Sequence, residues 1–209
     1  MTPTLLFVHG WGFSADFWQP LRQRLNGIPC LAWDLGFHGA PNRPLPAADG
    51  PVVAVGHSFG LLWLLKEHPL PWRALVSING FSRFTRADDF PQGVAPRLLE
   101  RMAARLEEAP AAVHRDFLAR CGMEAAASDG LDPARLAWGL SALAGWDCRA
   151  AAPVDLALCG RQDPIVPPAM SEALFAPALA KWRDGGHLLP LSDPDWCARQ
   201  LTAYLETLM

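Results

Sequence analysis

Three residues of this sequence could do chemistry together: a serine, an aspartate and a histidine. Ser58 lies at the centre of residues 56–60, a Gly-x-Ser-x-Gly pattern that directly follows the apolar run 52–55. A buried strand that ends at this pattern and continues into a helix holds its serine on a strained turn, with the hydroxyl exposed at the sheet edge. The context predicts that Ser58 is a nucleophile, although an ordinary strand-to-helix turn is the alternative.

A serine hydroxyl needs a base within hydrogen-bond reach and a carboxylate that orients this base. In folds that carry the serine on a Gly-x-Ser-x-Gly turn, the acid and the histidine come later in the chain. Each follows a further strand, and the acid precedes the histidine. Asp163 follows the apolar run 154–159, and His187 follows Gly185 and Gly186 after the run 178–182. We predict Asp163 as the orienting acid and His187 as the base.

Other acids and histidines have simpler interpretations. Asp163 could be a turn aspartate before a proline, while Asp155 lies inside the predicted strand and Asp147 before it. His9 is interpreted as a residue that braces its loop.

An oxyanion that forms on the substrate needs preformed donors, usually two backbone N–H groups. One is expected from Phe59, the residue after the nucleophile. The second is expected from the glycine-rich loop after the first strand, where Trp11 lies. The Trp11 indole is predicted to wall the acyl pocket as well.

The composition favours one globular domain. The chain has 209 residues, 51% of them hydrophobic, and a formal net charge of -3, which disfavours nucleic acid as a partner. Its apolar stretches are far shorter than the roughly 20 residues that span a bilayer. Five scattered cysteines suggest reduced thiols, and no metal or nucleotide motif is present. We expect a cytoplasmic monomer without metal or cofactor.

Apolar runs alternate with helical patterns at both ends of the sequence. This alternation predicts an α/β fold with a mostly parallel sheet of about six strands flanked by helices. Between residues 81 and 150 the pattern contains no strand. It predicts a helical lid inserted after the strand that ends near Asn79, with residues 1–80 and 151–209 as the core. Expected strands are 5–8, 28–33, 52–55, 72–78, 154–159 and 178–182, and expected helices include 14–25, 61–66, 96–106, 111–120, 133–143, 168–175 and 193–208.

Arginines recur in the predicted lid. Arg97, Arg101 and Arg105 are spaced by four residues and would share one helical face. The favoured interpretation is a solvated face, in which Glu100 pairs with Arg97 and Glu108 with Arg105. A docking face for an acidic carrier protein is the alternative.

The motifs together resemble the α/β-hydrolases over essentially the whole chain. Within them, residues 9–12 and the lid opening at 81–93 resemble the esterases that cleave pimeloyl-acyl-carrier-protein methyl ester in biotin synthesis. The resemblance implies that residues 117–121, with Phe117, Leu118 and Cys121, line the acyl chain, and that Arg115 and Arg135 contact the acidic carrier protein. The sequence begins at what would be the third strand of the usual sheet, so a smaller sheet is expected. The motifs are residues 9–12, 34–39, 56–60, 160–163 and 186–187.

The resulting hypothesis is a serine esterase that hydrolyses this methyl ester through an acyl-enzyme. A small-molecule carboxylesterase or lactonase without a carrier partner is the first alternative. A non-catalytic binding module with the same fold is the second.

Overall fold

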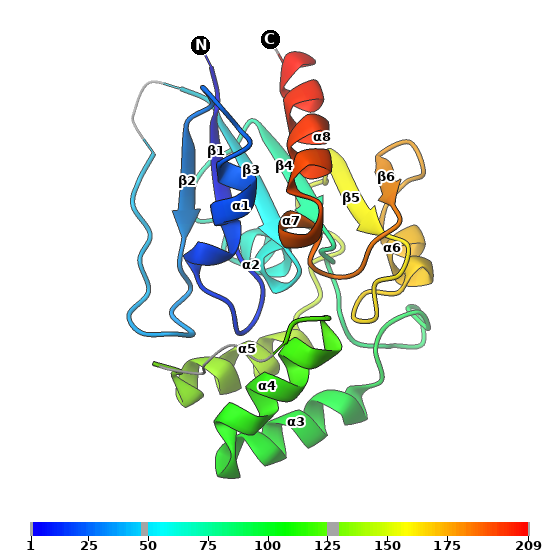
Figure 1. Ribbon diagram of the computed structural model, residues 1–209. Coiled ribbons are helices and arrows are strands. Elements are labelled where there is room, and N and C mark those ends of the chain that lie inside the picture. Colours follow the sequence, from blue (N-terminus) through cyan, green and yellow to red (C-terminus); the bar gives the residue numbers. More distant parts are fainter. Residues whose placement is uncertain (1, 47–49, 125–129, 209) are drawn as a thin grey trace.

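A single parallel sheet forms the centre of the protein, as seen in a computed structural model (Figure 1) that describes residues 2–46, 50–124 and 130–208. Its six strands lie in the order β2-β1-β3-β4-β5-β6, and every neighbouring pair is parallel. The predicted fold class is therefore confirmed. The strands are β1 (Thr4–Val8), β2 (Cys30–Trp33), β3 (Val52–His57), β4 (Ala74–Ile78), β5 (Leu156–Gly160) and β6 (Ala180–Arg183).

The strand order reverses direction at β1. The chain passes from β1 to β2 on one side and then returns to β3 on the other side. In open parallel sheets, the crevice outside the carboxyl ends of the strands at such a reversal is where ligands bind. The loop after β1 and the turn after β3 therefore lie side by side at this edge.

Helices cover both faces of the sheet (Figure 1). The 3-10 helix η1 (Ala15–Trp18) and helices α1 (Gln19–Arg22), α7 (Leu189–Ser192) and α8 (Pro194–Glu206) pack together on one face. Helix α2 (Phe59–Glu67) packs on β1, β3 and β4, and α6 (Pro168–Leu174) packs on β5.

Three further helices, which we call the insert helices, come between β4 and β5. They are α3 (Pro96–Glu108), α4 (Pro110–Arg120) and α5 (Pro133–Gly145). α3 packs against both α4 and α5, and Figure 1 shows all three beyond the carboxyl ends of the strands. No insert helix belongs to the sheet layers, so this segment can cover the sheet edge where Ser58 is expected.

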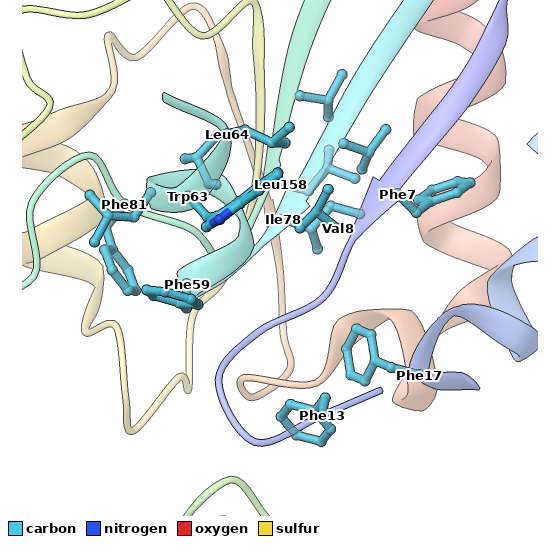
Figure 2. Packing of buried hydrophobic residues seen from close by; sticks show 14 of the residues in the cluster. Phe7, Val8, Phe13, Phe17, Phe59, Trp63, Leu64, Ile78, Phe81 and Leu158 are labelled. Atoms are coloured by element: carbon cyan, nitrogen blue, oxygen red, sulfur yellow. The ribbon is translucent and has the colours of Figure 1, made fainter. Parts of the chain in front are cut away.

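Aliphatic and aromatic side chains fill the space between the layers. Phe7 and its neighbour Val8 point to opposite faces of β1, as successive residues of a strand must. Figure 2 shows Trp63 and Leu64 of α2 on one side of the strands and Phe7 on the other side. All four side chains are at most 3% exposed. This packing fixes the ends of β1 and β3 and therefore the turns that follow them.

One predicted helix is wrong in its length. Residues 14–25 were expected to form one helix, but η1 and the single turn of α1 take its place. Ser14, the residue before η1, makes no capping hydrogen bond. The Ala15 N–H donates instead to the Asp34 carboxylate at 2.8 Å. Because this cap comes from the end of another strand, the local sequence does not reveal it.

Other predicted boundaries shift by a few residues. β4 begins at Ala74 instead of residue 72, and β2 begins at Cys30, after Pro29, which has no N–H for the ladder. The short helix α7 was not predicted. All five cysteines are free thiols, four of them buried, as expected. None of the described helices has the length and apolar character needed to cross a membrane.

Candidate active site

Ser58 occupies the sharp turn between β3 and α2. Its backbone φ is 53°, in the left-handed region that side chains rarely adopt. The flanking glycines have a steric reason: a Cβ on Gly60 would come within 2.2 Å of the Val8 carbonyl oxygen, and one on Gly56 within 2.4 Å of the Leu61 Cα. Only glycine fits at both positions, so the pattern and the strained turn require each other.

Hydrogen bonds connect the three residues that the sequence singles out. The Ser58 Oγ lies 3.0 Å from His187 Nε2, and His187 Nδ1 lies 2.8 Å from Asp163 Oδ2. The exposed fractions are 4%, 0% and 4% for Ser58, His187 and Asp163. Because the Asp163 carboxylate can only accept, the His187 proton lies on Nδ1 and is donated to Oδ2. Nε2 is then unprotonated and accepts a hydrogen bond from the serine hydroxyl. The arrangement can therefore take a proton from Ser58.

The second oxygen of Asp163 is also occupied. Asp163 Oδ1 accepts hydrogen bonds from the backbone N–H groups of Ile165 at 2.8 Å and Val166 at 2.9 Å. These bonds hold the carboxylate in the plane that points Oδ2 at His187. The two competing acids have structural partners elsewhere: Asp155 accepts from the Leu75 N–H, and Asp147 pairs with arginines.

Two backbone N–H groups are available beside Ser58. Within the described part of the chain, neither the Trp11 nor the Phe59 amide donates to a protein acceptor. Two insert helices contact the Trp11 side chain. Its indole Nε1 donates to the Leu136 carbonyl of α5 at 2.9 Å, and its ring packs edge-on against Phe117 of α4, with 4.9 Å between the ring centroids. Backbone amides that are held in place and free to donate to a substrate are the groups that an oxyanion hole needs.

The loop that carries Trp11 is braced by histidines. His9 Nε2 accepts from the Leu35 N–H at 3.0 Å, which confirms its predicted role as a loop brace. The Gly12 carbonyl accepts from His38 at 3.0 Å and from His114 of α4 at 2.7 Å. The insert helices thus contact the loop at Trp11 and at Gly12.

An apolar cavity of about 260 Å³ is lined mainly by the insert helices, with Trp11 and Ile165 contributed by the sheet edge. It begins at Trp11 and Ile165, next to the site, and the charged side chains of Arg105, Asp116 and Arg120 lie in its wall on α3 and α4. The remaining lining residues are Phe84, Val94, Leu98, Leu99, Met102, Val113, Phe117, Leu140 and Leu143.

The predicted acyl contacts divide into two pairs. Trp11 and Phe117 line the cavity, whereas Leu118 and Cys121 are buried and do not. Successive helix residues point about 100° apart, so a run such as 117–121 cannot face one cavity throughout. Burial, with a smaller contribution from the Asp163 charge, raises the pKa of the Cys121 thiol. Contact of Leu118 and Cys121 with an acyl chain stays a prediction.

The predicted pairing of the lid arginines is wrong for Arg105. This guanidinium lies 2.9 Å from the Asp116 carboxylate of α4, not on Glu108 of its own helix, because α3 and α4 pack against each other. Among the described residues, Arg97 and Arg101 form no ion pair. The predicted pair between Glu100 and Arg97 is therefore not formed either.

The two arginines with a predicted carrier contact lie in different surroundings. Arg115 is exposed on α4. Arg135 is half-buried on α5, with its guanidinium carbon 5.2 Å from the centre of the Trp138 ring.

Two buried polar residues beside the site had no predicted role. Asn79 and His57 both donate hydrogen bonds to the His187 carbonyl, at 2.8 and 2.9 Å. The only sequence signal was weak: asparagine tolerates a left-handed backbone at a strand end, and Asn79 has φ 46°. Among the described residues, no cluster of histidine, cysteine, aspartate or glutamate could hold a metal ion.

Comparison with known proteins defines the class first. A model of the alpha/beta hydrolase family matches residues 5–200, so the chain belongs to that family. Solved structures agree on the fold. An esterase (EaEST) from Exiguobacterium antarcticum superposes with a TM-score of 0.82 at 17% identity, covering 98% of this chain and 92% of that one. The enol-lactonase from Burkholderia xenovorans LB400 gives 0.74 at 20% identity, covering 99% and 92%.

More specific similarity is found among curated relatives. A pimeloyl-[acyl-carrier protein] methyl ester esterase of Neisseria meningitidis serogroup B (strain MC58) is 32% identical over 80% of this chain and 77% of its own length. The enzyme of the same name from Stenotrophomonas maltophilia (strain R551-3) is 30% identical over 99% of this chain and 94% of its own length. The resemblance predicted from the motifs is confirmed.

Proposed function

We propose that this protein is a serine ester hydrolase whose substrate is the methyl ester of a pimeloyl chain carried on acyl-carrier protein, in biotin synthesis. One observation carries the hydrolase part: the Ser58 hydroxyl, the His187 imidazole and the Asp163 carboxylate form one chain of hydrogen bonds. Beside it lie the Trp11 and Phe59 amides, which donate to no acceptor among the described residues. The similarity to the esterases from Neisseria and Stenotrophomonas supports the substrate.

The proposed reaction runs in two halves through an acyl-enzyme. Ser58 Oγ attacks the ester carbonyl carbon while its proton passes to His187 Nε2, and the Trp11 and Phe59 N–H groups hold the oxyanion. His187 then donates this proton to the departing methoxy group, which leaves as methanol. Water, deprotonated by His187, attacks the acyl-enzyme, and the carboxylic acid is released as Ser58 regains its proton. Asp163 orients His187 and stabilises the imidazolium in both halves.

The size and the lining of the cavity support a substrate with a slender, uncharged acyl chain. Its volume of about 260 Å³ lies below the roughly 300–1,000 Å³ of common ligand sites, and its wall is mostly aliphatic and aromatic. An esterified alkyl chain can be buried against these aliphatic and aromatic side chains without desolvating a charge of its own. We therefore propose that the insert helices, within residues 81–150, act as a lid that selects an esterified alkyl chain.

The exposed arginines support an acidic partner on the lid. Arg97, Arg101 and Arg115 are exposed on α3 and α4, the same helices that supply the charged wall of the cavity. An acidic carrier that docks there could direct its acyl chain into the cavity. Complementary charge of this kind mainly accelerates encounter and sets partner choice. Arg135, stacked on Trp138 of α5, would lie at the edge of such a contact.

Complementation of a biotin-requiring strain that lacks its methyl-ester esterase tests this proposal. We expect growth without biotin when the wild-type gene is expressed and no growth with Ser58→Ala at equal protein level. Failure of the well-expressed wild-type protein, combined with rapid cleavage of short p-nitrophenyl esters, would favour a small-molecule carboxylesterase. Absence of both activities would favour a non-catalytic binding module.

A further inference from the structure

Asn79 lies at the carboxyl end of β4 with all of its side chain buried. It is 2% exposed, and β4 has β3 on one side and β5 on the other. Its Nδ2 donates to the carbonyls of Gly186 at 2.9 Å and His187 at 2.8 Å, and its Oδ1 accepts from the Gly160 N–H at 2.8 Å. Because both donor contacts are to carbonyls and the acceptor contact is to an N–H, the orientation of the amide is unambiguous.

These three bonds join segments that are far apart in the sequence. Gly160 ends β5, three residues before Asp163, and Gly186 and His187 belong to the loop after β6. The loop crosses directly over the end of β5, since a Cβ on Gly160 would come within 2.6 Å of the Gly186 carbonyl oxygen. Asn79 therefore ties the backbone that carries His187 to the strand that leads to Asp163.

His57 adds a second bond to the same carbonyl. Its Nε2 donates to the His187 oxygen at 2.9 Å, and its ring stacks on Phe17 with the ring centres 4.4 Å apart. Burial holds the pKa of His57 well below its ordinary range, so the ring is neutral with its proton on Nε2. Since His57 directly precedes Ser58, this bond links the backbone of the serine turn to the backbone of His187.

We propose that Asn79 is a positioning residue that sets the distance between His187 Nε2 and Ser58 Oγ. Its two donors fix the His187 backbone, and the His57 bond acts in support. The inference rests on the proposed role of His187 as the base. Proton transfer depends steeply on this separation, which is 3.0 Å, so loosening the loop should lower kcat while leaving substrate binding unchanged.

The variant Asn79→Gly tests this directly, because glycine adopts the positive φ of this position freely and removes all three side-chain bonds. Ser77→Ala is the matched control. It removes the 3.1 Å bond from the Gly80 N–H to Ser77 Oγ at the end of the same strand and leaves the bonds of the His187 loop in place. The measurement is kcat and KM for p-nitrophenyl butyrate per active site, with sites counted by complete fluorophosphonate labelling and Tm recorded in parallel.

For Asn79→Gly we expect kcat per titrated site to fall about tenfold to a hundredfold with KM changed less than about twofold. Ser77→Ala should keep the wild-type kcat per site, whatever its Tm. If Asn79→Gly does not fold, Asn79→Asp serves instead: it keeps the acceptor for Gly160 and loses both donors, so the same loss of kcat is expected.

An Asn79 variant with kcat per site within about twofold of wild type would overturn the inference, even if its Tm fell, because the residue would then be structural only. Failure of the proposed function has a different signature. In that case the wild-type protein itself would show no ester hydrolysis that depends on Ser58, and both proposals would fall together.

Discussion

The carboxyl edge of the sheet and the insert helices are built by different means. At the sheet edge, polar side chains are buried and paired: Ser58, Asp163 and His187 are each at most 4% exposed and hydrogen-bonded. On the insert helices, the inner face lines an apolar cavity, and arginines such as Arg97 remain exposed. A fixed, buried site suits a chemical step, and an apolar space under a charged surface suits substrate selection. Under the proposed function, the sheet edge carries out the reaction and the insert helices select the substrate.

Replacing the nucleophile should abolish the chemistry that is assigned to the sheet edge. For Ser58→Ala we expect kcat to fall by roughly 10⁴-fold or more on every ester, with little change in Tm, because within residues 2–46, 50–124 and 130–208 the variant loses a side-chain hydrogen bond to His187 alone. Hydrolysis of a p-nitrophenyl ester and a thermal melt measure both quantities. Ser14→Ala, whose hydroxyl makes no capping bond, is the control. Residual activity above about 1% of wild type would contradict a serine mechanism.

The contact between the two regions can be disturbed at Gly139 of α5. A Cβ there would come within 2.5 Å of the Trp11 ring, which is 2% exposed and has little room to move. We expect Gly139→Ala to displace the Trp11 loop and lower kcat by about tenfold or more. Gly145→Ala, at the end of the same helix with no atom within 4 Å of the new Cβ, should keep wild-type kinetics. Equal kinetics for the two variants would mean that α5 does not position Trp11.

Reversing charge on α3 should affect the partner and spare the chemistry. For Arg97→Glu with Arg101→Glu we expect KM for the carrier-bound substrate to rise about tenfold at low salt and the difference to shrink as salt is added. Turnover of a short p-nitrophenyl ester should not change. Arg199→Glu, exposed on α8 away from the insert helices, is the control for each single substitution, Arg97→Glu and Arg101→Glu, because it changes the net charge by the same amount. If it weakened carrier-bound turnover equally, the effect would be one of net charge and not of docking.

The sheet edge and the insert helices should also differ, by a smaller effect, in how much they contribute to the loss of stability in acid. Burial lowers the pKa of both His57, under the sheet edge, and His114, on α4, from the ordinary 6.5, and the effect is greater for the fully buried His57. The unfolded chain therefore binds protons that the folded protein excludes, so stability is full above about pH 6.5 and falls as the pH is lowered below it.

Denaturant unfolding between pH 7.5 and 5 measures this dependence. We expect His57→Phe to reduce the slope of unfolding free energy against pH by up to about 1.4 kcal/mol per pH unit, and His114→Phe to reduce it less. A slope unchanged by His57→Phe would show that this ring is not held neutral.

The sequence predicted those parts of the site in which each residue is positioned by its neighbours in the chain. Ser58 needs Gly56 and Gly60 beside it for steric reasons, and Asp163 and His187 each follow a strand whose end must lie at the same sheet edge. The parallel sheet and the triad candidates could therefore be predicted, whereas the order of the strands in the sheet and the distances between the side chains could not.

The contacts that sequence reasoning missed are made between separate helices, strands and loops. Arg105 pairs with Asp116 because two helices pack together, and the Ala15 N–H is capped by Asp34 from another strand. Asn79 acts on a loop more than a hundred residues away. In each case local spacing offered a plausible partner or none, and tertiary packing supplied a different one.

The most direct test of the account is methanol release from pimeloyl-acyl-carrier-protein methyl ester by the purified protein. We predict rapid release by the wild-type protein, none above background with Ser58→Ala, and slower release with the Arg97→Glu, Arg101→Glu variant at low salt. A wild-type protein that cleaves p-nitrophenyl esters through Ser58 but releases no methanol from the carrier-bound ester would contradict the proposed substrate.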